Sequence, residues 1–242
     1  MTNQNVTISA LSGGSFNAYL AVPSTQPYAA IVLIQEILGV NQNMRQTADD
    51  YAKEGYLVLV PDLYWRLEPG VQLDSEVKAQ FDKGFELLQA FDVDSGIEDL
   101  KASLSFLRQY PSRTGKVGSL GFCLGGKLAY LMAIRTDADA NVSYYGVDIE
   151  KNLAEATKIQ KPLILHMDEN DEYVSPTAQA SIQQGLKNNP LVTIYRYEGV
   201  SHGFSRAGSS AYRKEAAELA RDRTLAFFKQ NLGSAVMQGV TS

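Results

Sequence analysis

The sequence Gly-Phe-Cys-Leu-Gly-Gly at residues 121–126 constrains the fold more than any other stretch of the chain. It follows an apolar run at 116–120 and precedes a helix-like segment at 127–133, so Cys123 is predicted on a sharp strand-to-helix turn. This is the pattern of a nucleophile elbow, G-x-S-x-G, with cysteine in place of serine. The flanking glycines let strand and helix approach closely while the central residue adopts a strained backbone conformation. At a helix N-terminus, backbone N–H groups and the helix dipole favour the thiolate.

Two other interpretations of this stretch remain open at this point. Residues 121–127 also read G-x-x-x-x-G-K, a phosphate-binding loop, but Leu128 stands where that motif needs Ser or Thr to hold Mg²⁺. The stretch also fits a tight turn that carries a small buried cysteine. A base and an acid farther along the chain would favour the nucleophile.

Composition limits the classes of partner. The 242 residues are 45% hydrophobic, which is enough for a substantial core. The net charge of −5 and the absence of a basic cluster argue against nucleic acid and anionic membranes as partners. The first residues contain no signal-peptide pattern, no apolar run approaches the ~20 residues of a membrane span, and a single cysteine excludes an internal disulfide. We therefore expect a cytoplasmic protein.

The order of apolar runs predicts an α/β fold. Alternating residues at 6–10 and 16–22 indicate an opening hairpin, and apolar runs indicate buried strands at 30–34 and 56–60. Further strands are predicted at 116–120, 141–146, 162–167 and 192–197. Helical segments are predicted at about 43–54, within the excursion that ends near 110, after 127, and at about 209–229. We expect a mostly parallel, doubly wound sheet with an antiparallel N-terminal hairpin. We expect the chain to form a single domain over 1–242, with a frayed tail at about 233–242.

Polar residues follow several of the predicted strand ends. Glu36, Cys123, the acidic run 168–172 and His202 all occupy such positions. Because ligands bind at the carboxyl ends of the strands in sheets of this kind, these residues are expected to meet at one edge.

The chain has two histidines, which narrows the choice of base. His166 lies inside the apolar run 163–167, which favours a buried histidine satisfied by the backbone. His202 lies in a loop after the last strand, about eighty residues beyond Cys123, and is the better candidate.

The candidate acid comes from the run 168–172, which contains four carboxylates. Asp171 is the preferred residue because 172–176 looks like a loop returning to a helix, whereas Asp168 and Glu169 lie nearer the strand. The chain order Cys123, Asp171, His202 is the nucleophile–acid–base order of the α/β-hydrolase fold. A metal site from His166, Asp168 and His202 has no supporting spacing, so we expect no metal and no cofactor.

Five segments together resemble a known family. They are Ile-Gln-Glu-Ile-Leu-Gly-Val-Asn at 34–41, Val-Pro-Asp-Leu-Tyr at 60–64, the elbow at 121–126, Tyr-Tyr-Gly at 144–146 and Ser-His-Gly-Phe at 201–204. These segments closely resemble the dienelactone hydrolases (carboxymethylenebutenolidases), and the resemblance extends over about 6–228. It implies the α/β-hydrolase fold and metal-free hydrolysis of a small-molecule lactone or ester through a Cys-His-Asp triad and a thioester.

The resemblance also implies roles for further residues. Glu36 matches a carboxylate that contacts the nucleophile and takes part in its activation. The backbone amides of Ile37 and Leu124 match the oxyanion hole, and Arg206 matches an arginine that holds a substrate carboxylate. Since a carboxylate beside a thiol raises the thiol's pKa, Glu36 could keep the thiol protonated until substrate arrives. The alternative for Glu36 is a simple arginine partner at the rim of the pocket.

The chain departs from the family at the substrate site. A second carboxylate-binding arginine of dienelactone-specific members is absent, and Phe81 stands at the aligned position. Phe81, Phe85 and Tyr145 are expected to contact the substrate. The predicted function is a dienelactone hydrolase-like ester hydrolase, acting as a monomer or weak homo-oligomer. Alternatives are a general carboxylesterase, a nucleotide-binding protein that uses 121–127, and a non-catalytic binding module.

Overall fold

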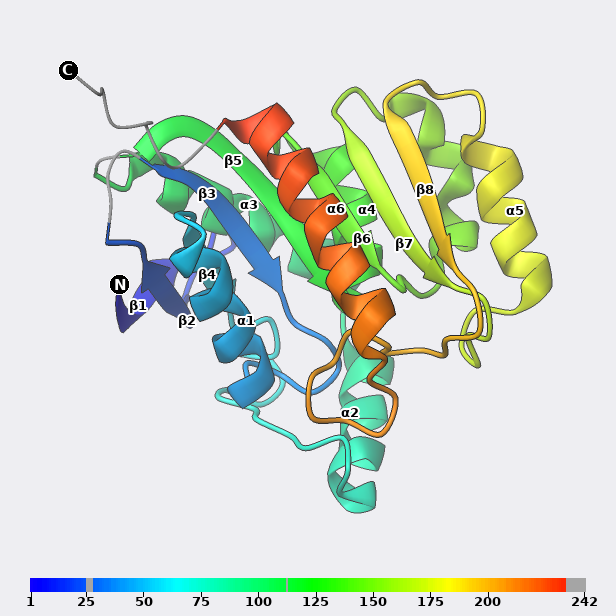
Figure 1. The fold of residues 1–242 in the computed structure, drawn as a ribbon. Coiled ribbons are helices and arrows are strands. Elements are labelled where there is room, and N and C mark those ends of the chain that lie inside the picture. Colours follow the sequence, from blue (N-terminus) through cyan, green and yellow to red (C-terminus); the bar gives the residue numbers. More distant parts are fainter. Residues whose placement is uncertain (25–27, 112, 234–242) are drawn as a thin grey trace.

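The computed structural model describes residues 1–24, 28–111 and 113–233. Eight strands form one sheet across this part of the chain (Figure 1). They are β1 (Thr2–Ser9), β2 (Ser15–Val22), β3 (Tyr28–Ile34), β4 (Leu57–Pro61), β5 (Arg113–Phe122), β6 (Asn141–Tyr144), β7 (Leu163–Asp168) and β8 (Val192–Tyr197). The strands lie in the order β1-β2-β4-β3-β5-β6-β7-β8, so the elbow strand β5 has three strands on one side of it and four on the other.

The pairing confirms the predicted topology. β1 pairs with β2 and β2 with β4 in antiparallel fashion, while every pair from β4 to β8 is parallel. The strands in the middle of the sheet are buried on both faces: all residues of β4, β6 and β7 are buried. The apolar run of β4 predicts this, whereas β6 and β7 are buried although they contain polar residues. β1 lies at the edge and alternates exposed and buried residues only near its end.

Helices cover both faces of the sheet. They are α1 (Gln42–Lys53), α2 (Lys78–Ala90), α3 (Val93–Gln109), α4 (Leu124–Arg135), the 3₁₀ helix η1 (Ile149–Lys158), α5 (Pro176–Leu186) and α6 (Lys214–Leu232). In Figure 1, α1 and α6 cross the front of the sheet, and α3 and α4 lie behind it. The helix α2 lies beyond the ends toward which the parallel strands point, and so does the loop between β8 and α6.

Three segments differ from the sequence prediction. The excursion between β4 and β5 contains two helices, α2 and α3, rather than one stretch, and η1 was not predicted. The last helix begins at Lys214 instead of near 209, because a series of turns occupies the chain between Phe204 and Arg213. Of the predicted frayed tail, residues 234–242 lie outside the described part. Among the described helices, none is both long and apolar enough to cross a membrane.

Candidate active site

Cys123 lies in a strained turn between β5 and α4. Its φ of 56° and ψ of −115° place a non-glycine residue in a sparsely populated region of backbone conformation, which costs about 1–3 kcal/mol. Leu124 begins α4 directly after it. Cys123 is buried, with 6% of the residue exposed, and it lines the cavity described below. This geometry is that of the predicted nucleophile elbow.

The glycines of the elbow are required by close backbone contacts. A Cβ on Gly121 would lie 2.0 Å from the carbonyl oxygen of Gly125, and a Cβ on Gly125 would lie 2.4 Å from that of Ile34. Both contacts are with backbone, which cannot move aside as a flexible side chain can. The first turn of α4 therefore lies directly against the ends of β3 and β5, and this fixes the direction of the Cys123 side chain.

The phosphate-loop interpretation of residues 121–127 is wrong. These residues form the end of β5 and the first turn of α4, and the glycine contacts leave no open backbone cradle between them. The Lys127 ammonium pairs with Asp148 at 3.4 Å and is mostly buried. Leu128, where a magnesium-binding hydroxyl would stand, belongs to the apolar core.

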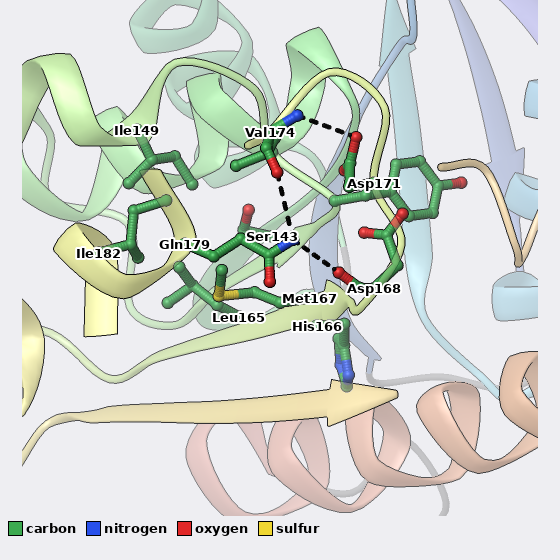
Figure 2. A pocket seen from close by; sticks show the side chains of 12 residues that line it. Ser143, Ile149, Leu165, His166, Met167, Asp168, Asp171, Val174, Gln179 and Ile182 are labelled. Atoms are coloured by element: carbon green, nitrogen blue, oxygen red, sulfur yellow. Dashed lines mark hydrogen bonds between the residues drawn. The ribbon is translucent and has the colours of Figure 1, made fainter. Parts of the chain in front are cut away.

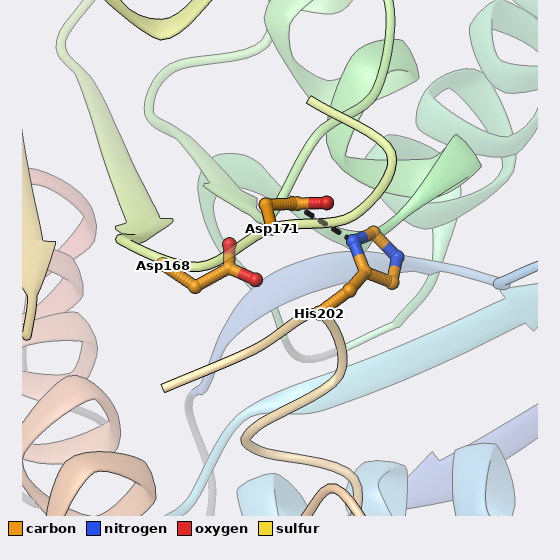
Figure 3. A group of neighbouring side chains, drawn as sticks. All are labelled: Asp168, Asp171 and His202. Atoms are coloured by element: carbon orange, nitrogen blue, oxygen red, sulfur yellow. Dashed lines mark hydrogen bonds and ion pairs between the residues drawn. The ribbon is translucent and has the colours of Figure 1, made fainter. Parts of the chain in front are cut away.

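His202 and Asp171 form a buried hydrogen-bonded pair (Figure 3). Nδ1 of His202 lies 2.9 Å from Oδ2 of Asp171, and both side chains are at most 4% exposed. The other carboxylate oxygen accepts hydrogen bonds from the backbone N–H groups of Tyr173 at 2.7 Å and Val174 at 3.1 Å. These contacts keep the pKa of Asp171 below its ordinary value, although burial alone would raise it. Asp171 is therefore an ionised partner that orients the imidazole.

The electrostatic environment of His202 favours the imidazolium. Burial alone would lower its pKa, but the negative charge of a Cys123 thiolate and the hydrogen bond to Asp171 raise it well above the ordinary value. A thiolate–imidazolium pair is the form of a cysteine nucleophile that attacks a carbonyl. Nε2 of His202 is buried, and no group of the described residues lies within hydrogen-bonding geometry of it.

His166, the other histidine, is part of a separate network. Its Nδ1 lies 2.7 Å from the Tyr197 hydroxyl and its Nε2 lies 3.0 Å from Oγ1 of Thr224. It is buried, as predicted, but its partners are side-chain hydroxyls rather than the backbone. Burial lowers the pKa of His166 to about 3, so the ring is neutral. The structure does not bring His166 together with His202. A metal site formed by His166, Asp168 and His202 is therefore wrong.

A cavity of about 160 Å³ opens over Cys123. Its wall combines the nucleophile and base with a mostly apolar surface: Ile37, Phe81, Phe85, Leu88, Cys123, Val147, Asp148, Tyr173, His202 and Arg206. Phe81 and Phe85 come from α2 and pack edge to face with ring centroids 5.1 Å apart. The ring of Tyr173 closes this aromatic wall at 5.7 Å from Phe85. The cavity is large enough for a small organic molecule and is lined for an apolar one.

Arg206 and Glu36 form a bidentate ion pair at the wall of this cavity. Nε of Arg206 lies 2.8 Å from Oε2 of Glu36, and Nη2 lies 2.9 Å from Oε1. Glu36 is 2% exposed and Arg206 10%, so the pair is buried instead of lying at the rim. The positive φ of Gly203, 80°, turns the chain so that the Arg206 guanidinium lies against it. Glu36 is thus observed with its arginine, one of the two arrangements expected from the sequence.

Of the two residues predicted to form the oxyanion hole with their backbone N–H groups, one follows Cys123 in the chain and the other lines the same cavity. Leu124 is the first residue of α4, and its N–H is one of those that no carbonyl within the helix can accept. Ile37 follows β3 and lines the same cavity as Cys123. Tyr145 is placed differently: its hydroxyl bonds Ser205 at 3.0 Å and its ring packs on His202 at 4.9 Å, without lining the cavity. A role for Tyr145 in substrate binding stays a prediction.

Comparisons with known proteins agree with this geometry. The model of the dienelactone hydrolase family matches residues 16–232. The chain belongs to that family. A protein of Azospirillum brasilense provisionally named carboxymethylenebutenolidase is 43% identical and covers 95% of this chain and 99% of its own length. The carboxymethylenebutenolidase of Pseudomonas putida is 39% identical over 94% of this chain and 96% of its own.

Solved structures support the fold of this dienelactone hydrolase family member. A Klebsiella pneumoniae protein provisionally named a dienelactone hydrolase superposes with a TM-score of 0.83 at 24% identity, over 95% of this chain and all of its own. The Pyrococcus furiosus esterase Pf2001 gives a TM-score of 0.73 at 18% identity, over 96% and 93% of the two chains. The fold is the α/β-hydrolase fold, as predicted.

Several residues around Cys123, Asp171 and His202 have no role that the sequence predicts. The sequence favours Asp171 over Asp168 as the acid, yet the carboxyl of Asp168 lies next to the Asp171–His202 pair (Figure 3). Figure 2 shows Gln179 of α5 next to the loop that contains Asp171. Its Nε2 donates hydrogen bonds to the carbonyls of Asp168 at 3.0 Å and Val174 at 3.2 Å. Tyr173 packs its ring against His202 at 4.8 Å. A polar residue after a strand is the only signal in the sequence, and many solvated loops share it.

Proposed function

We propose that the protein hydrolyses a carboxylic ester or lactone through a thioester on Cys123, with His202 as base and Asp171 as the acid that orients it. The observation that carries this proposal is the buried 2.9 Å contact between Nδ1 of His202 and Asp171, next to a strained cysteine at the base of an apolar cavity. Family membership supports ester or lactone hydrolysis as the reaction type.

Each step follows from the position of these groups. The Cys123 thiolate attacks the carbonyl carbon and forms a tetrahedral intermediate. His202 donates its proton to the leaving oxygen as the C–O bond breaks, which leaves the acyl group on sulfur. The neutral imidazole then takes a proton from water, whose oxygen attacks the thioester and releases the acid and the thiolate. Asp171 keeps the proton on Nδ1, so that Nε2 performs both transfers.

The backbone N–H groups of Ile37 and Leu124 are proposed to hold the oxyanion of both tetrahedral intermediates. They belong to two different elements, the turn after β3 and the N-terminus of α4. The glycine contacts between these elements fix the two N–H groups relative to each other. Removal of one such donor costs about 10²- to 10³-fold in rate.

The cavity wall favours a substrate with an apolar body and at most one carboxylate. Arg206 is the only arginine that lines the cavity among the described residues, and Phe81, Phe85 and Leu88 form its apolar wall. A substrate carboxylate that binds Arg206 would compete with Glu36 for the guanidinium. We propose that this pair regulates the thiol: Arg206 compensates the charge of Glu36 when it holds it, as observed, whereas a Glu36 carboxylate free of Arg206 would favour the protonated thiol. A general carboxylesterase acting on neutral esters is the second candidate, favoured by the same apolar wall.

The proposal is tested by a substrate panel. Lactones and aryl esters, with and without a carboxylate, are assayed on the wild type, Cys123→Ala and Arg206→Ala. Cys123→Ala should abolish turnover of all of them, and full activity in this variant would disprove the mechanism. Arg206→Ala should raise KM for the carboxylate-bearing members selectively. If the carboxylate makes no difference to the wild type, the general carboxylesterase is the better description.

We also propose a single domain over the chain, a monomer or weak homo-oligomer in solution, and a cytoplasmic location. The continuous eight-stranded sheet supports the first of these. The lone cysteine fits a reducing compartment.

A further inference from the structure

Asp168 is a buried carboxyl that the mechanism above does not use. It is the last residue of β7, it is 2% exposed, and its Oδ2 has no hydrogen-bond partner among the described residues. One oxygen of Asp168, one oxygen of Asp171 and a ring nitrogen of His202 all lie within 4.8 Å of one another (Figure 3). Two carboxyls are therefore buried side by side behind the base.

A proton must occupy one of these two carboxyls. Two buried carboxylates so close together repel each other. The pair therefore keeps one proton at pH values at which an ordinary carboxyl group has already lost it. Asp171 accepts hydrogen bonds from two backbone N–H groups and from His202, which stabilise its charge. Oδ2 of Asp168 accepts none from the described residues. The hydrogen bonds therefore assign the charge to Asp171 and the proton to Asp168.

The titration behaviour agrees with this assignment. Burial, and then the charge of Asp171, raise the pKa of Asp168 to about 8. The neighbouring Asp171 has its pKa lowered, as a residue would that keeps the charge of the pair. At neutral pH, Asp168 is mostly a neutral carboxylic acid.

We propose that Asp168 is a positioning residue that acts through Asp171, by donating a hydrogen bond from its protonated carboxyl to the Asp171 carboxylate. This inference rests on the function proposed above. The donated hydrogen bond withdraws charge from Asp171, and the proton on Nδ1 of His202 stays on the ring. Asp168 itself is behind the imidazole and does not line the substrate cavity.

Loss of the Asp168 proton would raise the pKa of His202, the proposed base. A second negative charge behind His202 stabilises the imidazolium, so a smaller fraction of His202 is neutral and able to take a proton from water. Each pKa unit added to His202 reduces that fraction by about tenfold. The other titratable groups around the carboxyl are His166, which is neutral because burial lowers its pKa to about 3, and Tyr145 and Tyr197, which are neutral because burial raises their pKa values. Gln179 from α5 is uncharged. Thioester hydrolysis should therefore slow as Asp168 ionises.

The first test is the pH profile of kcat for an ester whose thioester hydrolysis limits turnover. The wild type should lose activity with an apparent pKa near 8. Asp168→Asn keeps a donor toward Asp171 but cannot ionise, so its kcat should stay within about threefold of wild type at pH 6.5 and should not fall near pH 8. Asp168→Ala lacks the donor and should lower kcat at every pH with little change in KM.

The matched control is Glu169→Gln. This variant removes the next carboxylate along the same loop, whose bond is to the backbone N–H of Gly199. It should keep the wild-type profile, including the loss of activity near pH 8. A loss of kcat near pH 8 that persists in Asp168→Asn would overturn the proposal. The disappearance of this loss in Glu169→Gln would overturn it as well.

The second test needs no catalytic activity, so it separates this proposal from the proposed function. Infrared difference spectra should show a protonated carboxyl at pH 7 in wild type and in Glu169→Gln but not in Asp168→Asn. Absence of that band from the wild type would disprove the assignment even if the ester assays succeed. Conversely, its presence in a protein without ester turnover would leave the proton on Asp168 and disprove only the function.

Stability provides a third measurement if Asp168→Ala fails to fold. Folded Asp168 keeps its proton up to about pH 8, whereas an unfolded aspartate releases it near about pH 4. Folding therefore takes up a proton between these values, and the free energy of unfolding falls as pH rises. The stability of the wild type relative to Asp168→Asn should thus decrease steadily from pH 5 to pH 8. A difference that is constant with pH would contradict a proton on Asp168.

Discussion

His202 uses its two ring nitrogens for different tasks. Nδ1 bonds to Asp171, whereas Nε2 is buried on the side of Cys123 without a hydrogen-bond partner among the described residues. The bond to Asp171 fixes the tautomer, and the tautomer decides whether Nε2 can accept a proton from water. In the proposed mechanism, the ring nitrogen that carries this proton therefore determines whether Cys123 can complete a catalytic cycle.

Asp171→Asn tests this dependence on the tautomer. An amide can donate to Nδ1 and place the ring proton on Nε2, so kcat for p-nitrophenyl acetate should fall by about 10³- to 10⁴-fold. The neighbouring Glu172→Gln is the control, because Glu172 accepts a hydrogen bond from the backbone N–H of His202 and a glutamine keeps an acceptor oxygen. It should retain activity within several fold. Comparable losses in the two variants would contradict the tautomer argument.

At the scale of single residues, the sequence was informative where few residues of a type were available and their order in the chain limited the choice of nucleophile, base and acid. Two histidines and one cysteine left few possible triads, and the structure places Cys123, Asp171 and His202 together as predicted. Asp168 could not be assigned in this way, because three residues of spacing do not show whether the loop turns back on itself. The burial of both carboxyls results from that turn, which Gln179 holds from another helix.

At the scale of elements, the site depends on how closely α4 approaches the ends of β3 and β5. Gly125→Ala tests that approach, since a Cβ there would meet the backbone carbonyls of Ile34 at 2.4 Å and Gln35 at 2.7 Å. We expect the free energy of unfolding to fall by about 3 kcal/mol or more, measured by denaturant unfolding. Gly185→Ala is the matched control, because its Cβ would meet only the flexible side chain of Leu153 at 3.0 Å. An equal effect of the two substitutions would show that the close approach does not matter.

The helix α2 supplies part of the cavity wall, and we expect this part to set the substrate preference. Phe81 lines the cavity from this helix, where a second arginine would stand in dienelactone-specific relatives. Phe81→Arg should raise the ratio of kcat/KM for carboxylate-bearing over neutral esters by about tenfold, since a hydrogen bond to a charged group contributes about 1.5–3 kcal/mol. Phe81→Lys should give a smaller gain because it lacks the bidentate geometry. An unchanged ratio in Phe81→Arg would show that α2 does not contact the substrate carboxylate.

The excursion between β4 and β5 was the least predictable region. Residues 64–77 contain few periodic apolar positions, and the boundary between α2 and α3 depends on Asp92, whose side chain caps α3 by accepting from the N–H of Ser95. A local cap of this kind is visible in the sequence only after the helix boundary is known. By contrast, β3 and β4 were predicted well because each is a continuous apolar run, which is typical of a strand buried on both faces.

At the scale of the whole molecule, one sheet connects every part of the described chain. α6, from the C-terminal end, packs on β5: a Cβ on Gly118 would meet both Phe228 and Leu232 of that helix. Unfolding of any one strand from β3 to β7 would therefore expose the core on both faces. We expect a single cooperative thermal transition, with calorimetric and van't Hoff enthalpies that agree. Two resolved transitions would contradict the proposal of one domain.

The position of Cys123 has a practical consequence for counting working molecules. It is the only sulfhydryl of the chain, and it is buried in the wall of the cavity in which we propose that the substrate binds. A thiol reagent small enough to enter therefore reports the fraction of folded, competent centres directly, with one equivalent bound per chain at full occupancy. Any tight-binding substrate analogue should protect that equivalent, so ligand affinities become measurable by stoichiometry alone, before a natural substrate is known.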